Sequence, residues 1–265
     1  MSENTQWEAR LDLPSHFAPY DFDEVQMRSM SVGVVKQVRA YANGGTNKHL
    51  AEIVRPCYSI DPAQLTLGDF WYTLAWLRLN TFSNVPLVVE WECPVCGHKN
   101  TESLDLQGIP IDELPDDFQE PIYITTSRGV EFPVRLYRVR DEIATEKYLE
   151  RKYKGEYTAA DEQLVDLAAV WVHDGTLADK HAALESGDVL SPQDIEEVRA
   201  ALATLRHGPR ATMTSTCKER DCGYTADAIP VRFQLQRLVP SPEEIRRFAA
   251  PAIRFGAVRE SASDG

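Results

Sequence analysis

Four of the five cysteines form two short pairs, and thiolates at such spacings bind metal ions. The first pair, Cys93 and Cys96, has two residues between its members, and the second, Cys217 and Cys222, has four. A glycine follows each pair directly. Glycine permits the positive φ that lets a short loop fold back, so that both sulfurs can reach one ion. The pattern predicts one structural zinc ion per chain, bound by four thiolates.

The spacing of these cysteines departs from that of a compact zinc ribbon. The second pair is wider than the usual two-residue spacing, and roughly 120 residues separate the pairs where a compact ribbon has about 15–20. Two other interpretations stay open, namely reduced buried cysteines and a redox dithiol. A thioredoxin-like dithiol opens a helix, whereas strand-like sequence flanks these pairs. Cys57 is expected to be a buried apolar residue, and His98 an exposed residue or an outer-shell group of the metal site.

Four thiolates fill the coordination sphere of zinc, so this metal is expected to stabilise structure and to catalyse no reaction. The six histidines show no HExxH spacing. The sequence also contains no phosphate-binding loop, no dinucleotide-binding glycine pattern and no nucleophile elbow. The chain is therefore not expected to be an enzyme, and no catalytic or cofactor-binding residue is proposed.

The composition is that of a folded, acidic protein. Of the 265 residues, 43% are hydrophobic, and the net charge is −13. Nucleic acids and anionic membrane surfaces both attract basic faces, so neither is expected as the main partner. The sequence shows no signal-like segment and no apolar run long enough to span a bilayer. A reducing cytoplasm, where disulfides rarely persist, is therefore expected.

The elements that position the cysteines predict an α+β fold. Residues 1–26 mix prolines with large apolar residues and are expected to form an extended arm, packed on its own domain or on a neighbour. Residues 27–84 form a helical region, whose strongest helix, over 67–79, is apolar nearly all round and therefore buried. Residues 85–106 together with 211–235 are expected to form a zinc-ribbon β element.

The remaining segments are expected to form an insertion and a C-terminal piece. Residues 107–210 are predicted to contain a linker over 107–119, then a β-hairpin, then several helices. Ser191-Pro192 marks the start of the last of these helices, because proline is favoured at the first helical position. Residues 236–265 are predicted to hold a short helix, opened by a capping box at Ser241, and a tail.

The junction between the buried helix and the first cysteine pair resembles a known family. The residues that carry the resemblance are Leu65-Thr66-Leu67-Gly68-Asp69-Phe70-Trp71-Tyr72, Trp76-Leu77-Arg78-Leu79-Asn80-Thr81-Phe82, Cys93-Pro94-Val95-Cys96-Gly97-His98, Leu104-Asp105-Leu106 and the leader Leu13-Pro14-Ser15. Together they resemble the hub-associated baseplate proteins of T-even-type contractile-tailed phages. The similarity covers residues 11–110 and is loose beyond them.

The resemblance implies a structural role in the virion, in the tail baseplate around the central spike. The implied partners are other baseplate, hub or tail-tube proteins, with several copies of the chain in each particle, assembled in the host cytoplasm. The zinc pair carries over at Cys93 and Cys96, while Cys217 and Cys222 rest on the residues alone. Two alternatives remain: an assembly factor absent from the mature virion, and a zinc-ribbon nucleic-acid-binding module.

Overall fold

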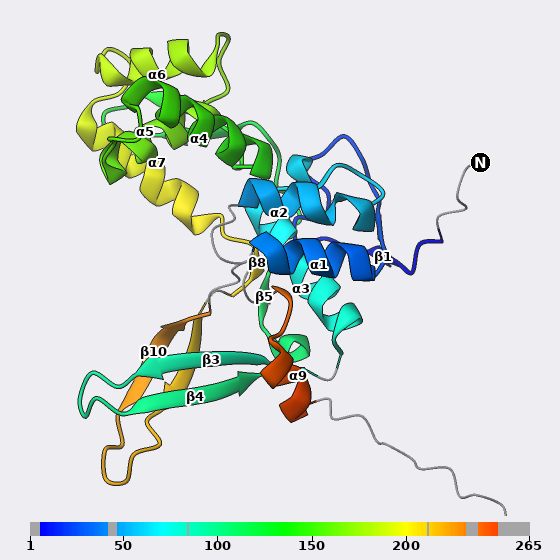
Figure 1. Ribbon diagram of the computed structural model, residues 1–265. Coiled ribbons are helices and arrows are strands. Elements are labelled where there is room, and N and C mark those ends of the chain that lie inside the picture. Colours follow the sequence, from blue (N-terminus) through cyan, green and yellow to red (C-terminus); the bar gives the residue numbers. More distant parts are fainter. Residues whose placement is uncertain (1–5, 42–46, 84, 211, 232–237, 249–265) are drawn as a thin grey trace, which may run out of the picture.

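Three hydrophobic cores organise the computed structural model, which describes residues 6–41, 47–83, 85–210, 212–231 and 238–248. Helices are combined with two-stranded antiparallel sheets, so the α+β prediction is confirmed. Figure 1 shows the N-terminal helices to the right, the later helices at the upper left and two long hairpins at the lower left. Within the described residues, we find no helix that combines the length and apolarity needed to cross a membrane.

The first core belongs to helices α1 (Val32–Tyr41), α2 (Asn47–Val54) and α3 (Leu67–Thr81). The helix predicted over 67–79 is present as α3. Three residues of its apolar face are no more than 2% exposed in this core: Phe70, Leu74 and Leu77. A helix buried on most sides needs partners around it, and the N-terminal arm is one of them.

The N-terminal arm is a short β-ribbon that packs on its own domain. Strand β1 (Ala9–Leu11) pairs antiparallel with β2 (Val25–Met27). The aromatic residues between these strands, Phe17, Tyr20 and Phe22, pack against the first core. Part of their apolar surface is thereby removed from water, which favours this arrangement over a free extended leader.

A buried carboxylate fastens the arm to α3. Asp69 has no exposed surface, and its Oδ2 accepts a hydrogen bond from the Tyr20 hydroxyl at 2.5 Å. Its Oδ1 accepts from the Ser15 backbone N–H at 3.1 Å. The Thr66 N–H in turn donates to the Tyr20 oxygen at 2.8 Å. The buried charge is thus compensated by donors from the arm, as a buried charge requires.

Removing the Tyr20 hydroxyl tests this attachment. Tyr20→Phe is expected to lower the free energy of unfolding by about 2 kcal/mol, because Asp69 loses a charge-assisted hydrogen bond and the Thr66 N–H loses its acceptor. Urea unfolding measures the loss. The matched control is Tyr123→Phe, since Tyr123 is 60% exposed and its substitution should change stability by no more than about 0.5 kcal/mol. Equal losses in the two variants would contradict the attachment.

The second core lies inside the predicted insertion. Its elements follow in the order β6 (Ile122–Thr125), β7 (Glu131–Val134), α4 (Val139–Tyr153), α5 (Ala159–Val170), α6 (Leu177–Glu185) and α7 (Pro192–Thr204). The hairpin and the helices are present as predicted. Ser191 caps α7 with its side chain, and Pro192 is the first helical residue, as predicted.

The segment 107–119 is more than the linker that the sequence predicts. It contains the short strand β5 (Ile111–Asp112), which pairs with β8 (Gly208–Pro209) at the other end of the insertion. A strand of two residues has no alternation of apolar and polar positions, so its prolines and acidic residues indicated only a linker. The pairing brings the two ends of the insertion together.

The third core lies between two β-hairpins. One joins β3 (Leu87–Glu92) to β4 (Lys99–Leu104), and the other joins β9 (Thr212–Thr216) to β10 (Thr225–Pro230). Both hairpins contribute buried residues to this core, among them Leu87 and Val89 from β3 and Ile229 from β10. Near the C-terminus, α9 (Pro242–Phe248) begins with the predicted capping box, in which the Glu244 N–H donates to the Ser241 hydroxyl at 3.1 Å. The predicted tail lies outside the described residues.

Candidate metal centre

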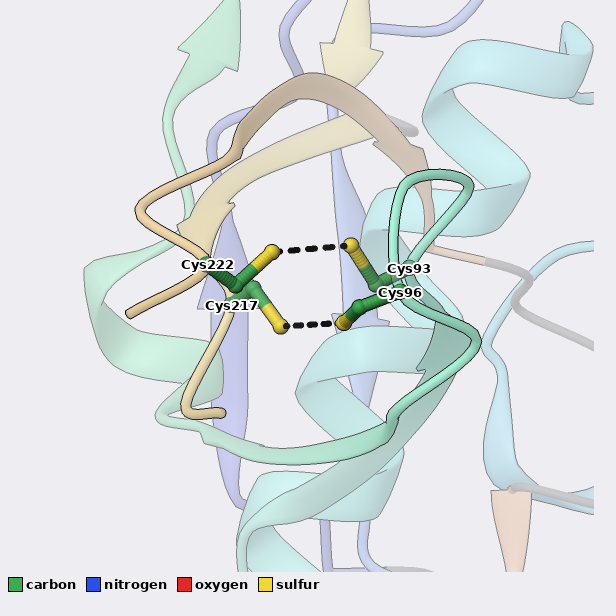
Figure 2. A group of neighbouring side chains, drawn as sticks. All are labelled: Cys93, Cys96, Cys217 and Cys222. Carbon is green, nitrogen blue, oxygen red and sulfur yellow. Dashed lines mark hydrogen bonds between the residues drawn. The ribbon is translucent and has the colours of Figure 1, made fainter. Parts of the chain in front are cut away.

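The four cysteines come together at the tips of the two hairpins (Figure 2). Cys93 and Cys96 lie in the turn between β3 and β4, and Cys217 and Cys222 in the turn between β9 and β10. The Sγ atoms of Cys93 and Cys222 are 3.7 Å apart, and those of Cys96 and Cys217 are 3.6 Å apart. All four sulfurs lie within 4.8 Å of one another, and all are free thiols.

The distances between these sulfurs suit one tetrahedral ion. A zinc ion with Zn–S bonds of about 2.3 Å holds its sulfurs about 3.8 Å apart. A disulfide would instead bring two sulfurs to about 2.05 Å. The cluster can therefore hold a single metal ion between the two hairpins, and none of its four sulfurs is joined to another in this arrangement.

The two turns present their sulfurs in similar ways despite their different lengths. Gly97 and Gly223 have φ values of 71° and 59°, which confirms the backbone role expected of the glycine after each pair. The extra length of the second turn is taken up before Cys222, where Asp221 also has a positive φ of 65°. The wider spacing is thus accommodated by one additional left-handed residue, and it does not displace the second sulfur.

The close approach of the four sulfurs shifts the pKa values of their thiols. The pKa of Cys93 is lowered to about 7, since backbone N–H groups and neighbouring thiols outweigh the opposing effect of desolvation. The pKa of Cys96 is raised to about 12, because desolvation and the other three sulfurs outweigh the lowering effect of the His98 backbone. The thiolate form is therefore favoured at Cys93 and disfavoured at Cys96. A divalent cation removes the repulsion between thiolates, as thiolate ligation requires.

Asn100 supports the cluster from behind. It is 1% exposed, and its Nδ2 lies 3.6 Å from the Sγ of Cys217 and 3.2 Å from the His98 carbonyl oxygen, to which it donates. Its Oδ1 accepts the Lys218 N–H at 2.8 Å. One side chain on the first hairpin therefore orients Cys217 and the backbone of the second hairpin. Sequence reasoning missed this residue, because an asparagine in a strand has no distinguishing spacing.

Substitution of Asn100 tests its supporting role. Asn100→Ala is expected to weaken metal binding about 10- to 100-fold, as is typical when a group that orients a metal ligand is removed. Competition with a chromogenic chelator measures the affinity. Asn80 is exposed on α3 and donates to the Trp76 carbonyl oxygen at 2.9 Å, so Asn80→Ala is the matched control and should leave the affinity unchanged. A similar affinity in both variants would remove Asn100 from the site.

Neither His98 nor Cys57 belongs to the cluster, which consists of Cys93, Cys96, Cys217 and Cys222. The Nδ1 of His98 lies 2.8 Å from the Glu219 carboxylate, so this half-exposed residue links the two turns. Cys57 lies in the first core at 1% exposure, as the sequence predicts, and burial raises the pKa of its thiol to about 11. The fifth cysteine is thus an apolar packing residue.

Comparison of the chain with protein-family models, with curated proteins and with solved structures finds no match.

Proposed function

We propose that this chain is a structural component of a contractile phage tail baseplate, in the hub region, and that its four cysteines bind one structural zinc ion. The observation that carries the zinc assignment is the meeting of four sulfurs at spacings suited to a tetrahedral ion. What supports the baseplate assignment is the resemblance of residues 11–110 to the hub-associated family.

In this proposal the two hairpins form a zinc ribbon interrupted by the insertion over residues 107–210. Four thiolates leave zinc no open position for water or substrate, so the ion stabilises the fold. The insertion then extends from a base joined twice, by the metal and by the β5–β8 pair. A component that transmits load between neighbours in a tail benefits from such a base, because it limits hinge motion.

Elemental analysis of the purified chain tests the metal assignment. One zinc per chain is expected. An S₄ site also suits iron, so the visible absorption spectrum is recorded in parallel. A colourless protein with one equivalent of zinc supports the assignment, whereas a coloured iron protein or a protein without metal contradicts it.

Mass spectrometry of purified virions of the phage that encodes this chain tests the baseplate assignment. Peptides of the chain are expected in finished particles, at an abundance that corresponds to several copies of the chain per particle. Presence on tail intermediates together with absence from finished particles would instead support the assembly factor. Absence from both would contradict each of these roles.

The acidic balance of the chain disfavours the nucleic-acid-binding alternative. With a net charge of −13, the chain is expected to shift neither DNA nor RNA in a gel at low salt. Binding that falls steeply as salt rises would support the nucleic-acid-binding module against the structural role.

A further inference from the structure

A cavity of about 720 Å³ lies where α3, α5, α7 and the β5–β8 pair meet. This volume falls within the range of small-molecule sites, about 300–1,000 Å³. The apolar part of its lining includes Leu67, Trp71, Leu136, Leu167, Leu202 and Leu205. Side chains from four separate segments of the chain thus line an apolar space that the metal centre does not use.

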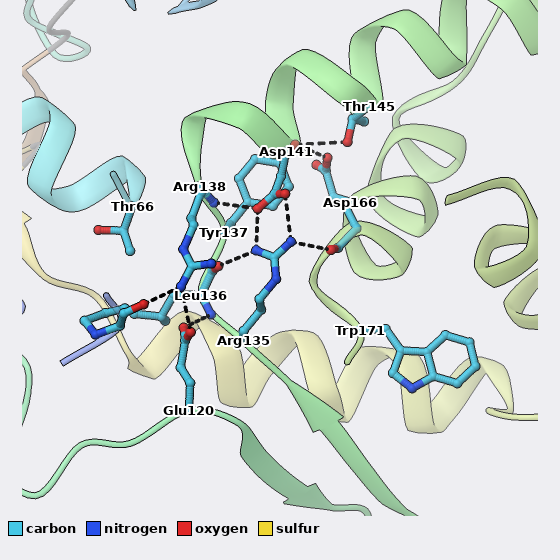
Figure 3. Close-up of polar contacts among 12 residues, drawn as sticks. Thr66, Glu120, Arg135, Leu136, Tyr137, Arg138, Asp141, Thr145, Asp166 and Trp171 are labelled. Atoms are coloured by element: carbon cyan, nitrogen blue, oxygen red, sulfur yellow. Dashed lines mark hydrogen bonds and ion pairs between the residues drawn. The ribbon is translucent and has the colours of Figure 1, made fainter. Parts of the chain in front are cut away.

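The charged residues around this cavity are mainly arginines, in contrast to the acidic chain as a whole. They are Arg135, Arg199, Arg206 and Arg210, against the carboxylates Asp112 and Asp166. Figure 3 shows one of these arginines, Arg135, engaged with Asp141, at distances of 2.5 and 2.8 Å. Arginine binds carboxylate and phosphate groups well, so an arginine of this lining without a carboxylate partner would favour an anionic group on the ligand.

Arg206 is the arginine available to a ligand. Arg199 pairs with Glu196 at 2.7 Å and Arg210 with Asp112 at 2.8 Å. Arg206 is exposed, and among the residues that the structure describes it makes no hydrogen bond or ion pair. Its guanidinium can therefore form two parallel hydrogen bonds to a carboxylate or phosphate without losing an existing partner.

Both carboxyl groups of the lining are already engaged, Asp112 with Arg210 and Asp166 with Tyr137. Asp166 accepts a hydrogen bond from the Tyr137 hydroxyl at 2.7 Å, and burial raises the pKa of this carboxyl. Both effects reduce its competition for an arginine. The strongly acidic remainder of the chain disfavours a polyanion, so a ligand with a single anionic group fits best.

We propose that this cavity binds a small organic anion, whose apolar body fills the leucine- and tryptophan-lined space and whose carboxylate or phosphate pairs with Arg206. The site is separate from the metal centre, and its occupation is independent of the proposed baseplate role.

Two dyes that differ by one charged group test the proposal. The probe is 8-anilinonaphthalene-1-sulfonate, and N-phenyl-1-naphthylamine has the same aromatic body without the sulfonate. The sulfonate dye is expected to bind the folded, metal-loaded chain with about 1:1 stoichiometry and more tightly than the neutral dye, with an affinity that falls as salt rises. Failure of the sulfonate dye to bind would overturn the proposal.

Three variants locate the binding. Arg206→Gln should weaken binding of the sulfonate dye about fivefold and leave binding of the neutral dye unchanged. Arg140→Gln makes the same charge change at an exposed position outside the lining and should alter neither dye. Gln163→Trp fills the cavity from an exposed position of α5 and should weaken binding of both dyes. Equal behaviour of the two glutamine variants, or full binding by Gln163→Trp, would overturn the site.

Competition distinguishes the two head groups. Octanoate and octyl phosphate have the same apolar chain, and displacement of the sulfonate dye by either one supports the proposal and identifies the preferred group. Displacement by neither would overturn it. Near-UV circular dichroism of each variant shows that the fold is retained.

Discussion

Replacing Cys217 by serine is expected to remove the metal and to lower the free energy of unfolding by about 5 kcal/mol. The binding energy of a structural zinc ion is folding energy, of about 10–16 kcal/mol in small zinc-binding peptides. In the proposed site the ion would join segments far apart in the chain, since Cys96 and Cys217 are separated by 121 positions. Loss of one ligand also leaves the other three sulfurs crowded without a cation to compensate their charge.

The measurement combines elemental analysis with urea unfolding, with and without a strong chelator. The chelator should destabilise the unmodified chain and have little effect on Cys217→Ser, which has no metal to lose. Cys57→Ala is the matched cysteine control, because Cys57 is buried in the first core. It should retain one metal per chain and lose about 1 kcal/mol. Full metal retention after substitution of both Cys217 and Cys222 would refute the four-thiolate site.

A second large effect is expected where β8 crosses α3. A Cβ atom added at Gly208 would lie 2.4 Å from the carbonyl oxygen of Gly68, a distance that forces the backbone to move. Gly208 also has a φ of 91°, which side-chain-bearing residues rarely adopt. Gly208→Ala is therefore expected to lower the free energy of unfolding by about 3 kcal/mol because of the overlap and by about 1 kcal/mol more because of the backbone conformation.

Gly187 separates these two contributions. Its φ is 76°, and a Cβ atom there would meet nothing within 4 Å. Gly187→Ala should therefore lose only about 1 kcal/mol, the cost of the backbone conformation. Urea unfolding compares the two variants directly. Equal losses of stability in the two variants would show that the close approach of Gly208 to Gly68 adds nothing to the cost of the substitution.

The same crossing places His207 in contact with the arm attachment. Its Nε2 lies 2.6 Å from the Thr66 hydroxyl and 3.9 Å from the Asp69 carboxylate, and its side chain is 6% exposed. The six histidines show no metal-ligand spacing in the sequence, and His207 has no other distinguishing feature there. This contact could not be predicted, because 141 positions separate Thr66 from His207.

The elements of the fold that depend on nearby residues could be predicted from the sequence. The apolar residues of α3 recur at helical spacing, Ser191 and Ser241 cap helices through groups three positions away, and each cysteine turn ends in a glycine. In each case the interacting groups lie within about one helical turn or one β-turn. The residue types alone therefore specify the local structure.

The four cysteines of the candidate site were also predicted, because thiolates are few in the sequence and their pairs are distinctive. That the pairs meet was an inference from residue chemistry, and the distances between their sulfurs come only from the tertiary structure. Asn100 shows the limit of this reasoning. Its partners on the second hairpin are 117 and 118 positions away, and nothing in the neighbouring residues marks it.

The sequence by itself determined the types of element, the capped helix starts and the four cysteines of the candidate metal site. Only the tertiary structure decided how these parts are joined: the β5–β8 pair, the crossing of Gly208 over Gly68, and the arginine-rimmed cavity between α3, α5 and α7. The physical reason is that each of these features forms between surfaces that are distant along the chain. Their complementarity depends on shape and packing in three dimensions, which leave no periodic pattern in the order of the residues.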